Sequence, residues 1–165
     1  MTLEELNWLD EAELSEALWN CCGSSAWVAG MMELFPVGSA TGLYAAASLV
    51  WRDCTEEDWR EAFRAHPRIG DMESLQKKFG GTAAAAEQSG TSEAGIEVLG
   101  ALAEGNKKYE ERFGYIFIVC ATGKSAVEML GLLRERLGNA PEEEILIAMG
   151  EQEKITRIRL EKLLS

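Results

Sequence analysis

Signals for the start of an α-helix recur along this chain and constrain its fold more than any other feature of the sequence. Thr2 and Glu5 have the spacing of a capping box. Thr55 and Asp58 have the same spacing. In such a box each residue's side chain bonds the backbone N–H of the other, which satisfies two donors that the first helical turn leaves open. Asp10 can cap a further helix. The pattern predicts an all-α protein.

The remaining caps and apolar repeats divide the chain into helices joined by short turns. The helices are expected at about residues 11–21, 24–34, 41–52, 55–65, 72–79, 92–112, 125–137 and from 141 onwards. One run, YIFIVC at 115–120, is short, apolar and partly β-branched, and it predicts an extended segment without an obvious partner strand. We therefore expect a helical bundle of about eight to ten helices, forming a single domain over residues 1–165.

The last helix is expected to turn one apolar face inward. Helical spacing selects five residues for that face: Ile145, Ala148, Ile155, Ile158 and Leu163.

The charge of the chain excludes some classes of partner. Its 28 acidic residues outnumber 16 basic ones, for a formal net charge of -12. Nucleic-acid binding depends largely on neutralising phosphates, and attraction to anionic lipid likewise needs clustered basic residues, so neither partner is expected. A small anionic substrate remains compatible, provided that local arginines offset the overall field.

Neither a membrane span nor a metal site is expected from the sequence. No apolar stretch reaches the length that crosses a bilayer, and the acidic start MTLEELNWLDEAEL lacks the layout of a secretory signal. The four cysteines, Cys21, Cys22, Cys54 and Cys120, fit no zinc-finger or zinc-ribbon spacing. We expect reduced, mostly buried thiols in a cytoplasmic protein.

The only histidine of the chain, His66, lies in the hexapeptide HPRIGD after a predicted helix. Histidine is the ordinary side chain that exchanges protons near neutral pH. It could equally cap the helix before it, where a positive charge meets the helix dipole. Pro67 stiffens the turn and Gly70 permits close approach of a ligand, which favours a functional histidine on a rigid corner.

Two further places could contribute to such a site. Glu87 and Gln88 follow four alanines, so the carboxylate could project into a small cavity and pair with an imidazole, or lie solvated on a helix surface. Arg157 and Arg159 are two residues apart on the last helix and point to different faces, so at most one can enter a site. The other, with Arg157 the stronger candidate, would form a surface ion pair with a nearby glutamate.

Four segments together resemble the OHCU decarboxylase family: HPRIGD, the Glu87-Gln88 pair, NKKYEERFGYIFIVCATG and KITRIRLEKLL. The likeness runs from about Cys22 to Leu164. Members of this family decarboxylate 2-oxo-4-hydroxy-4-carboxy-5-ureidoimidazoline (OHCU) to (S)-allantoin in urate degradation. The resemblance implies an all-α fold, a small anionic heterocyclic substrate, no metal or organic cofactor, and a homodimer.

The resemblance also assigns site residues. Its catalytic pair falls on His66 and Glu87. Its substrate-binding positions fall on Pro67, Ala84, Gln88, Phe117, Ile118, Val119, Cys120, Ala121 and Arg159. Many members carry serine three residues before the glutamate, where this chain has alanine, so either a hydroxyl contact is lost or the loop is shifted by a small deletion.

Two other functions compete with a decarboxylase. The fold could persist as an inactive module that binds a small ligand, and the alanine at residue 84 is the best support for that. A hydrolase or thiol enzyme using Cys120 is the other, although cysteine is more often buried than reactive.

Overall fold

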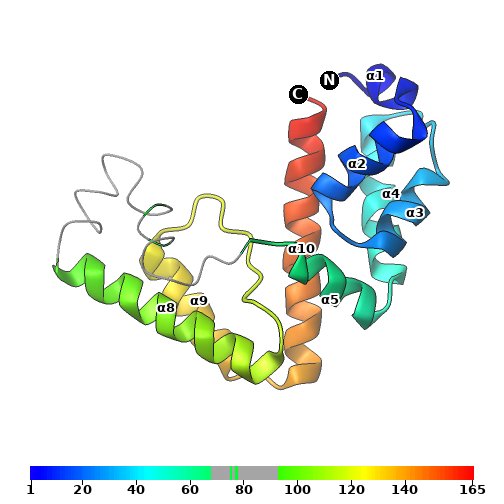
Figure 1. Ribbon diagram of the computed structural model, residues 1–165. Coiled ribbons are helices and arrows are strands. Elements are labelled where there is room, and N and C mark those ends of the chain that lie inside the picture. The colour runs from blue at the N-terminus through cyan, green and yellow to red at the C-terminus, as the bar shows by residue number, and fades with distance from the viewer. Residues whose placement is uncertain (68–74, 76, 78–92) are drawn as a thin grey trace. The chain divides into compact units, whose positions relative to one another are not determined.

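The computed structural model describes residues 1–67, 75, 77 and 93–165. These residues contain eight α-helices and no β-strand (Figure 1). The helices are α1 (Leu3–Trp8), α2 (Glu11–Cys21), α3 (Ser25–Met32), α4 (Ala40–Asp53), α5 (Glu56–Arg64), α8 (Glu93–Phe113), α9 (Ala126–Leu137) and α10 (Pro141–Leu163). The all-α prediction is confirmed. The segment 115–120 is irregular, while most of the helix expected at 72–79 lies outside the described residues.

The caps explain where the first helices begin. The backbone N–H of Glu5 donates to Oγ1 of Thr2, and the N–H of Thr2 donates back to the Glu5 carboxylate. Thr55 and Asp58 make the same reciprocal bonds. A further capping box, which begins at Asp10, caps the N-terminal end of α2 in the same way. These side chains satisfy backbone donors that would otherwise lack partners.

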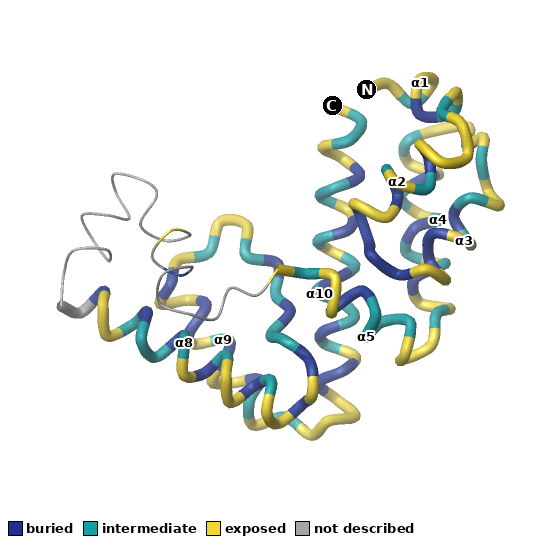
Figure 2. Tube along the Cα trace, viewed as in Figure 1, coloured by how far each residue is buried: buried dark blue, intermediate teal, exposed yellow. Residues whose placement is uncertain are grey.

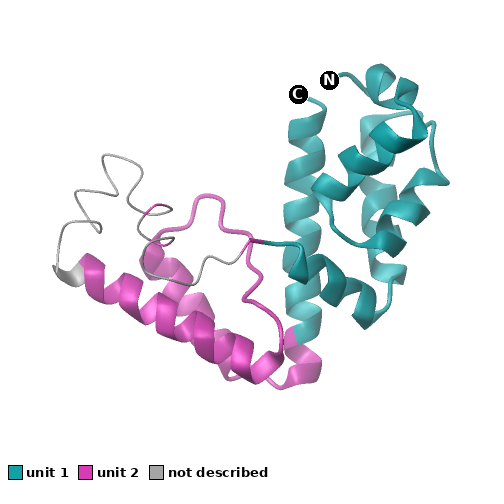
Figure 3. Cartoon of the chain, in the orientation of Figure 1, with its two compact units in different colours: residues 1–66, 145–165 teal, residues 67–144 magenta. Residues whose placement is uncertain are grey.

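The described chain divides into two compact units, drawn in different colours in Figure 3. The first unit contains residues Met1–His66 and Ile145–Ser165. The second contains residues Pro67–Glu144. Helix α10 contributes its first turn to the second unit and its remaining residues to the first.

The core of the first unit is built around two tryptophans. Trp27 and Trp51 are both almost fully buried, and each indole N–H has a backbone partner. Trp27 donates to the carbonyl of Ala47 at 3.1 Å, and Trp51 donates to that of Met149 at 2.9 Å. Burial of an indole is favourable when its one polar group is satisfied in this way. The second of these bonds ties α4 to α10.

The buried face of α10 differs from the predicted one. Figure 2 shows buried residues recurring along this helix, and five fit the helical repeat: Ile145, Ala148, Gln152, Thr156 and Leu160. The prediction is right for the first two. It is wrong for the other three residues that it named, since Ile155, Ile158 and Leu163 are only partly buried. Two polar side chains occupy the inner stripe instead.

In the second unit α8 and α9 pack side by side (Figure 1). The two helices approach closely at Gly105 of α8, where an added Cβ would lie 2.5 Å from Cδ2 of the fully buried Leu133. The absence of a side chain therefore lets the two helices approach closely. The aromatic rings of Tyr109, Phe113 and Tyr115 gather at the end of α8.

No helix within the described ranges is both long enough and apolar enough to cross a bilayer.

The close approach of α8 and α9 predicts opposite effects for two glycine-to-alanine changes in one helix. Gly105→Ala should lower the free energy of unfolding by about 1–3 kcal/mol, because the buried Leu133 must be displaced. Gly100→Ala, where a Cβ meets nothing within 4 Å, should raise it by about 0.5–1 kcal/mol. Urea unfolding of both variants measures the difference. Equal effects would contradict the proposed packing.

Candidate functional site

His66 follows the end of α5 and is half-buried. Its backbone N–H donates to the carbonyl of Phe63 at 3.2 Å, which continues the turn of the helix. The imidazole ring contacts α10, where its Nε2 lies 2.5 Å from Oε1 of Gln152. The imidazole is therefore held by a side chain of the last helix, whereas the sequence suggested that it could cap α5.

Gln152 continues a chain of buried hydrogen bonds. Its Nε2 donates to Oγ1 of Thr156 at 3.1 Å, one turn further along α10. The hydroxyl of Thr156 in turn acts on the thiol of Cys22, whose pKa it lowers against the larger effect of burial. Gln152, Thr156 and Cys22 are 1%, 5% and 0% exposed, so water cannot replace these partners. The chain fixes how the amide of Gln152 faces His66.

Arg159 lies close enough to the imidazole for its positive charge to act on it. Its Nη1 donates to the carbonyl of Cys21 at 3.3 Å, and the side chain is half-buried. Arg157, by contrast, is exposed and pairs with Glu161 at 2.5 Å. The prediction of a surface ion pair for Arg157 is therefore confirmed.

The pKa of His66 is lowered from its ordinary value of 6.5. Burial is the main cause, because it disfavours the charged ring, and the positive charge of Arg159 acts in the same direction. The hydrogen bond to Gln152 opposes both by favouring the protonated form. His66 is consequently a neutral imidazole at physiological pH, able to accept a proton.

The extended segment 117–121 belongs to the second unit, where a buried arginine anchors it. Nη1 of Arg136, in α9, donates to the carbonyl of Ile118 at 2.7 Å, and its guanidinium lies 4.5 Å from the ring centroid of Phe117. Arg136 is 6% exposed. The backbone that the resemblance assigns to substrate binding is thus fixed by a charged side chain.

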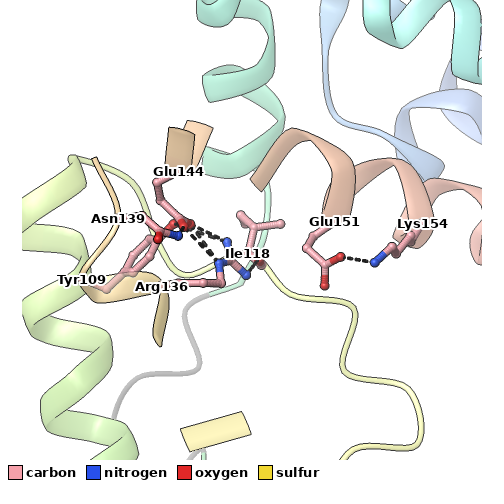
Figure 4. Close-up of polar contacts among 7 residues, drawn as sticks. All are labelled: Tyr109, Ile118, Arg136, Asn139, Glu144, Glu151 and Lys154. Atoms are coloured by element: carbon pink, nitrogen blue, oxygen red, sulfur yellow. Dashed lines mark hydrogen bonds and ion pairs between the residues drawn. The ribbon is translucent and has the colours of Figure 1, made fainter. Parts of the chain in front are cut away.

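The charge of Arg136 is balanced by Glu144, in the first turn of α10. Arg136 Nη2 lies 2.6 Å from Oε2 of Glu144, which is fully buried. Asn139 Nδ2 and the hydroxyl of Tyr109 also donate to this carboxylate, as Figure 4 shows. Burial and Glu144 raise the pKa of Tyr109, so its hydroxyl remains a donor. Figure 4 also shows the Glu151–Lys154 ion pair, whose lysine is exposed.

The structure therefore gathers some predicted site residues and leaves others unplaced. His66 and Arg159 come together in the first unit. In the second unit Pro67 is exposed, while the 117–121 segment is irregular, with Ile118 and Cys120 buried. Three predicted residues lie outside the described ranges: Ala84, Glu87 and Gln88.

Three of the cysteines are poor candidates for chemistry. Burial raises the pKa of Cys21 and Cys54 to about 11 and that of Cys22 to about 12. Such thiols are protonated and unreactive near neutral pH. Cys120 is buried as well, and the expectation of mostly buried thiols is confirmed. Within the described ranges, no group of three or more histidine, cysteine or acidic residues could hold a metal.

Sequence reasoning missed Gln152, Arg136 and Glu144. Gln152 could have been found from helical spacing, since it lies four residues after Ala148 and eight before Leu160, in line with the buried face. A search for apolar residues alone does not select it, because its side chain is polar. Nothing in the sequence distinguished Arg136 or Glu144 from the other charged residues of their helices.

Comparisons with known proteins bear on what this site does. The family model described as OHCU decarboxylase matches residues 7–161. The uric acid degradation bifunctional protein TTL of Arabidopsis thaliana is 38% identical over 156 residues, which make up 93% of this chain and 48% of that protein. The chain thus spans about half the length of that relative.

Two further matches extend over nearly whole proteins. A 2-oxo-4-hydroxy-4-carboxy-5-ureidoimidazoline decarboxylase of Halalkalicoccus jeotgali is 26% identical, with 99% of this chain and 92% of that protein covered. A crystal structure of OHCU decarboxylase in the presence of (S)-allantoin is 39% identical, with a TM-score of 0.73. That match covers 90% of this chain and 97% of the other.

The buried ion pair predicts a pronounced asymmetry between single and double substitutions. Arg136→Met should lower the free energy of unfolding by about 3–5 kcal/mol, because it leaves the Glu144 carboxylate buried without its charge partner. The double variant Arg136→Met/Glu144→Leu should recover much of that loss. Urea unfolding of the two variants tests this. A double variant less stable than the single one would show that the pair is not coupled as described.

The depressed pKa of His66 predicts how stability depends on pH. Below 6.5 the unfolded chain binds a proton at His66 more readily than the folded protein does, so acidification favours unfolding. Between about pH 7.5 and about pH 5.5 the wild-type protein should therefore lose more stability than His66→Gln. Urea unfolding at several pH values measures the difference. A steeper loss in the variant would refute the pKa direction.

Proposed function

The chain belongs to the OHCU decarboxylase family, and on that basis we propose that it converts 2-oxo-4-hydroxy-4-carboxy-5-ureidoimidazoline to (S)-allantoin. The reaction is a decarboxylation in urate degradation, which makes the protein a carboxy-lyase. The observation that supports it most directly is the state of His66. The ring is half-buried, neutral, held by Gln152 and subject to the charge of Arg159.

The substrate itself can supply the electron sink for this reaction. When the bond between the ring carbon and the carboxylate breaks, CO2 leaves and the bonding electrons stay with the ring. They form a double bond to the neighbouring ring carbon, and the electrons of that carbon's double bond to nitrogen move onto the nitrogen. A proton from solvent neutralises that nitrogen and leaves an enol. The hydroxyl proton must then be removed and a proton added to one face of carbon 5, which gives the carbonyl and the stereocentre of the product. No external oxidant or reductant is needed.

His66 suits the last step because a neutral imidazole can take the hydroxyl proton and return it to carbon. A single base that performs both transfers from one side of the ring would explain why one enantiomer forms. Arg159 carries a fixed positive charge next to His66 and suits an anionic substrate, since its planar fork binds carboxylate or ureido oxygens. The same charge adds to the effect of burial, which is the main cause of the lowered pKa of His66.

The other roles are carried over from the family resemblance. Glu87 would orient the hydroxyl or ureido group and tune His66, with Gln88, Pro67 and the residue at 84 beside the substrate. Backbone groups of 117–121 would fix the heterocycle. The anchoring of Ile118 by Arg136 supports this assignment, because a binding surface made of backbone groups must be held rigidly.

We also propose that residues 1–165 act as one family domain, that the protein is a cytoplasmic homodimer, and that it uses no metal or organic cofactor. The match of the family model to residues 7–161 supports the first proposal. The homodimer and the absence of a metal or organic cofactor follow from the resemblance to the family, and the cytoplasmic location follows from the mostly buried free thiols.

Loss of the imidazole should abolish most of the activity without unfolding the protein. His66→Ala should lower kcat about 10²- to 10⁴-fold, the usual contribution of a positioned acid–base group. Circular dichroism follows the appearance of (S)-allantoin from OHCU prepared freshly from urate. Lys154→Leu, an exposed change on α10, serves as the control and should keep wild-type turnover.

The same assay separates the alternatives. Near-normal turnover by His66→Ala would remove the histidine from the mechanism, and full activity with full stereoselectivity in Glu87→Gln would demote the glutamate. A wild-type protein that forms no allantoin above the spontaneous rate would support the inactive binding module. Full activity in Cys120→Ala would exclude a role for its thiol, and a substitution is needed because the buried Cys120 could escape an alkylating reagent.

A further inference from the structure

We propose that Gln152 is a positioning residue of this site: its side-chain oxygen holds His66 in the Nε2–H tautomer, so that Nδ1 is the atom that exchanges protons with the substrate. The role of Nδ1 in turnover rests on the proposed function. The tautomer is a property of the protein without substrate and can be measured on its own.

The contact at His66 is the first step of the argument. Nε2 of the ring lies 2.5 Å from Oε1 of Gln152. An amide oxygen only accepts hydrogen bonds, so the hydrogen in this contact must be on the imidazole nitrogen. A neutral imidazole carries one ring hydrogen. The other nitrogen, Nδ1, is therefore left as an acceptor.

The direction of the whole chain depends on Thr156 and Cys22. With Oε1 facing His66, the amide N–H of Gln152 donates to Thr156, and the hydroxyl of Thr156 is free to donate to the sulfur of Cys22. The reversed chain would need the thiol of Cys22 to donate to Thr156. A thiol is a weak donor and a hydroxyl is a strong one, so the first direction is favoured.

Burial makes this direction difficult to reverse. Gln152, Thr156 and Cys22 are almost inaccessible to water, so a turned amide could not find substitute partners in solvent. An unsatisfied buried donor or acceptor costs about 1–3 kcal/mol, and this penalty maintains the orientation.

The arrangement has a mechanistic consequence. The Nε2–H bond to Gln152 is present in both the neutral and the protonated ring, so this contact need not rearrange when the ring gains a proton. Only Nδ1 changes its protonation state. Each transfer to or from the substrate would then occur at one fixed atom, with the ring orientation preserved throughout the cycle.

The experiment uses the fact that His66 is the only histidine in the sequence. Labelling histidine with ¹⁵N gives one pair of ring nitrogen resonances, and no assignment to a residue is needed. At a pH where the ring is neutral, the nitrogen that carries hydrogen and the bare nitrogen resonate far apart. We expect the wild-type protein to show one locked form, with hydrogen on Nε2.

Variants test whether Gln152 is the cause. Gln152→Leu should let the Nδ1–H form appear as a measurable fraction and shift both resonances toward their average. Gln152→Glu keeps an acceptor but raises the pKa of the ring, so it is measured at a pH high enough to leave the ring neutral, where it should retain the Nε2–H form as the conservative rescue. Thr156→Val removes the orienting hydroxyl and should give a smaller shift in the same sense. Lys154→Leu is the matched control on α10 and should change neither resonance.

Two results would overturn the proposal: a wild-type ring with its hydrogen on Nδ1, or unchanged resonances in both Gln152→Leu and Thr156→Val. If Gln152→Leu fails to fold, Thr156→Val and Gln152→Glu decide alone. Activity provides a separate measurement, in which Gln152→Leu should lower kcat with little change in KM. A wild-type protein without decarboxylase activity would refute the proposed function and leave the tautomer result standing.

Discussion

The helical repeat of α10 is the constraint on which both units depend. Its first turn supplies Glu144, the buried partner of Arg136, to the second unit. Two turns later the same helix supplies Gln152 to the first unit, where it holds His66. Within each unit, the helical register of α10 decides which of its side chains faces the neighbouring residues.

Both buried polar systems follow the same physical rule with different chemistry. A buried charge or amide is costly unless all its partners are present. Arg136 and Glu144 satisfy the rule with opposite charges and added hydrogen bonds from Asn139 and Tyr109. Gln152 satisfies it with a neutral chain. The neutral chain suits a proton-transfer site, because it orients His66 without adding a nearby charge that would protonate the ring permanently.

The sequence predicted the helical fold well because its signals are local. The caps at Thr2, Asp10 and Thr55 involve residues three apart, so they can be read without tertiary information. The face of α10 was predicted only in part. Ile155 and Ile158 were favoured because they are apolar, whereas tertiary packing selected Gln152, which has a partner 86 residues away.

The sequence also predicted the candidate site only in part. His66 was found because it is the only histidine, and Arg159 was preferred to Arg157 by the resemblance. Helix geometry alone required that the two arginines differ, and the Arg157–Glu161 pair agrees with that reasoning. The role of Arg136 could not be predicted, because it depends on a tertiary contact. Its guanidinium donates to the carbonyl of Ile118, in another segment of the same unit.

The buried ion pair also limits how sequences of this kind can drift. A lineage that loses the guanidinium at 136 before the carboxylate at 144 must pass through a protein with an unpaired buried charge. The cost of that charge is a large part of the free energy of unfolding of a marginally stable domain. The two positions should consequently change together or not at all. Descendants that have replaced the pair with apolar residues would have lost the anchor of Ile118 as well, and would need another donor to hold that backbone in place.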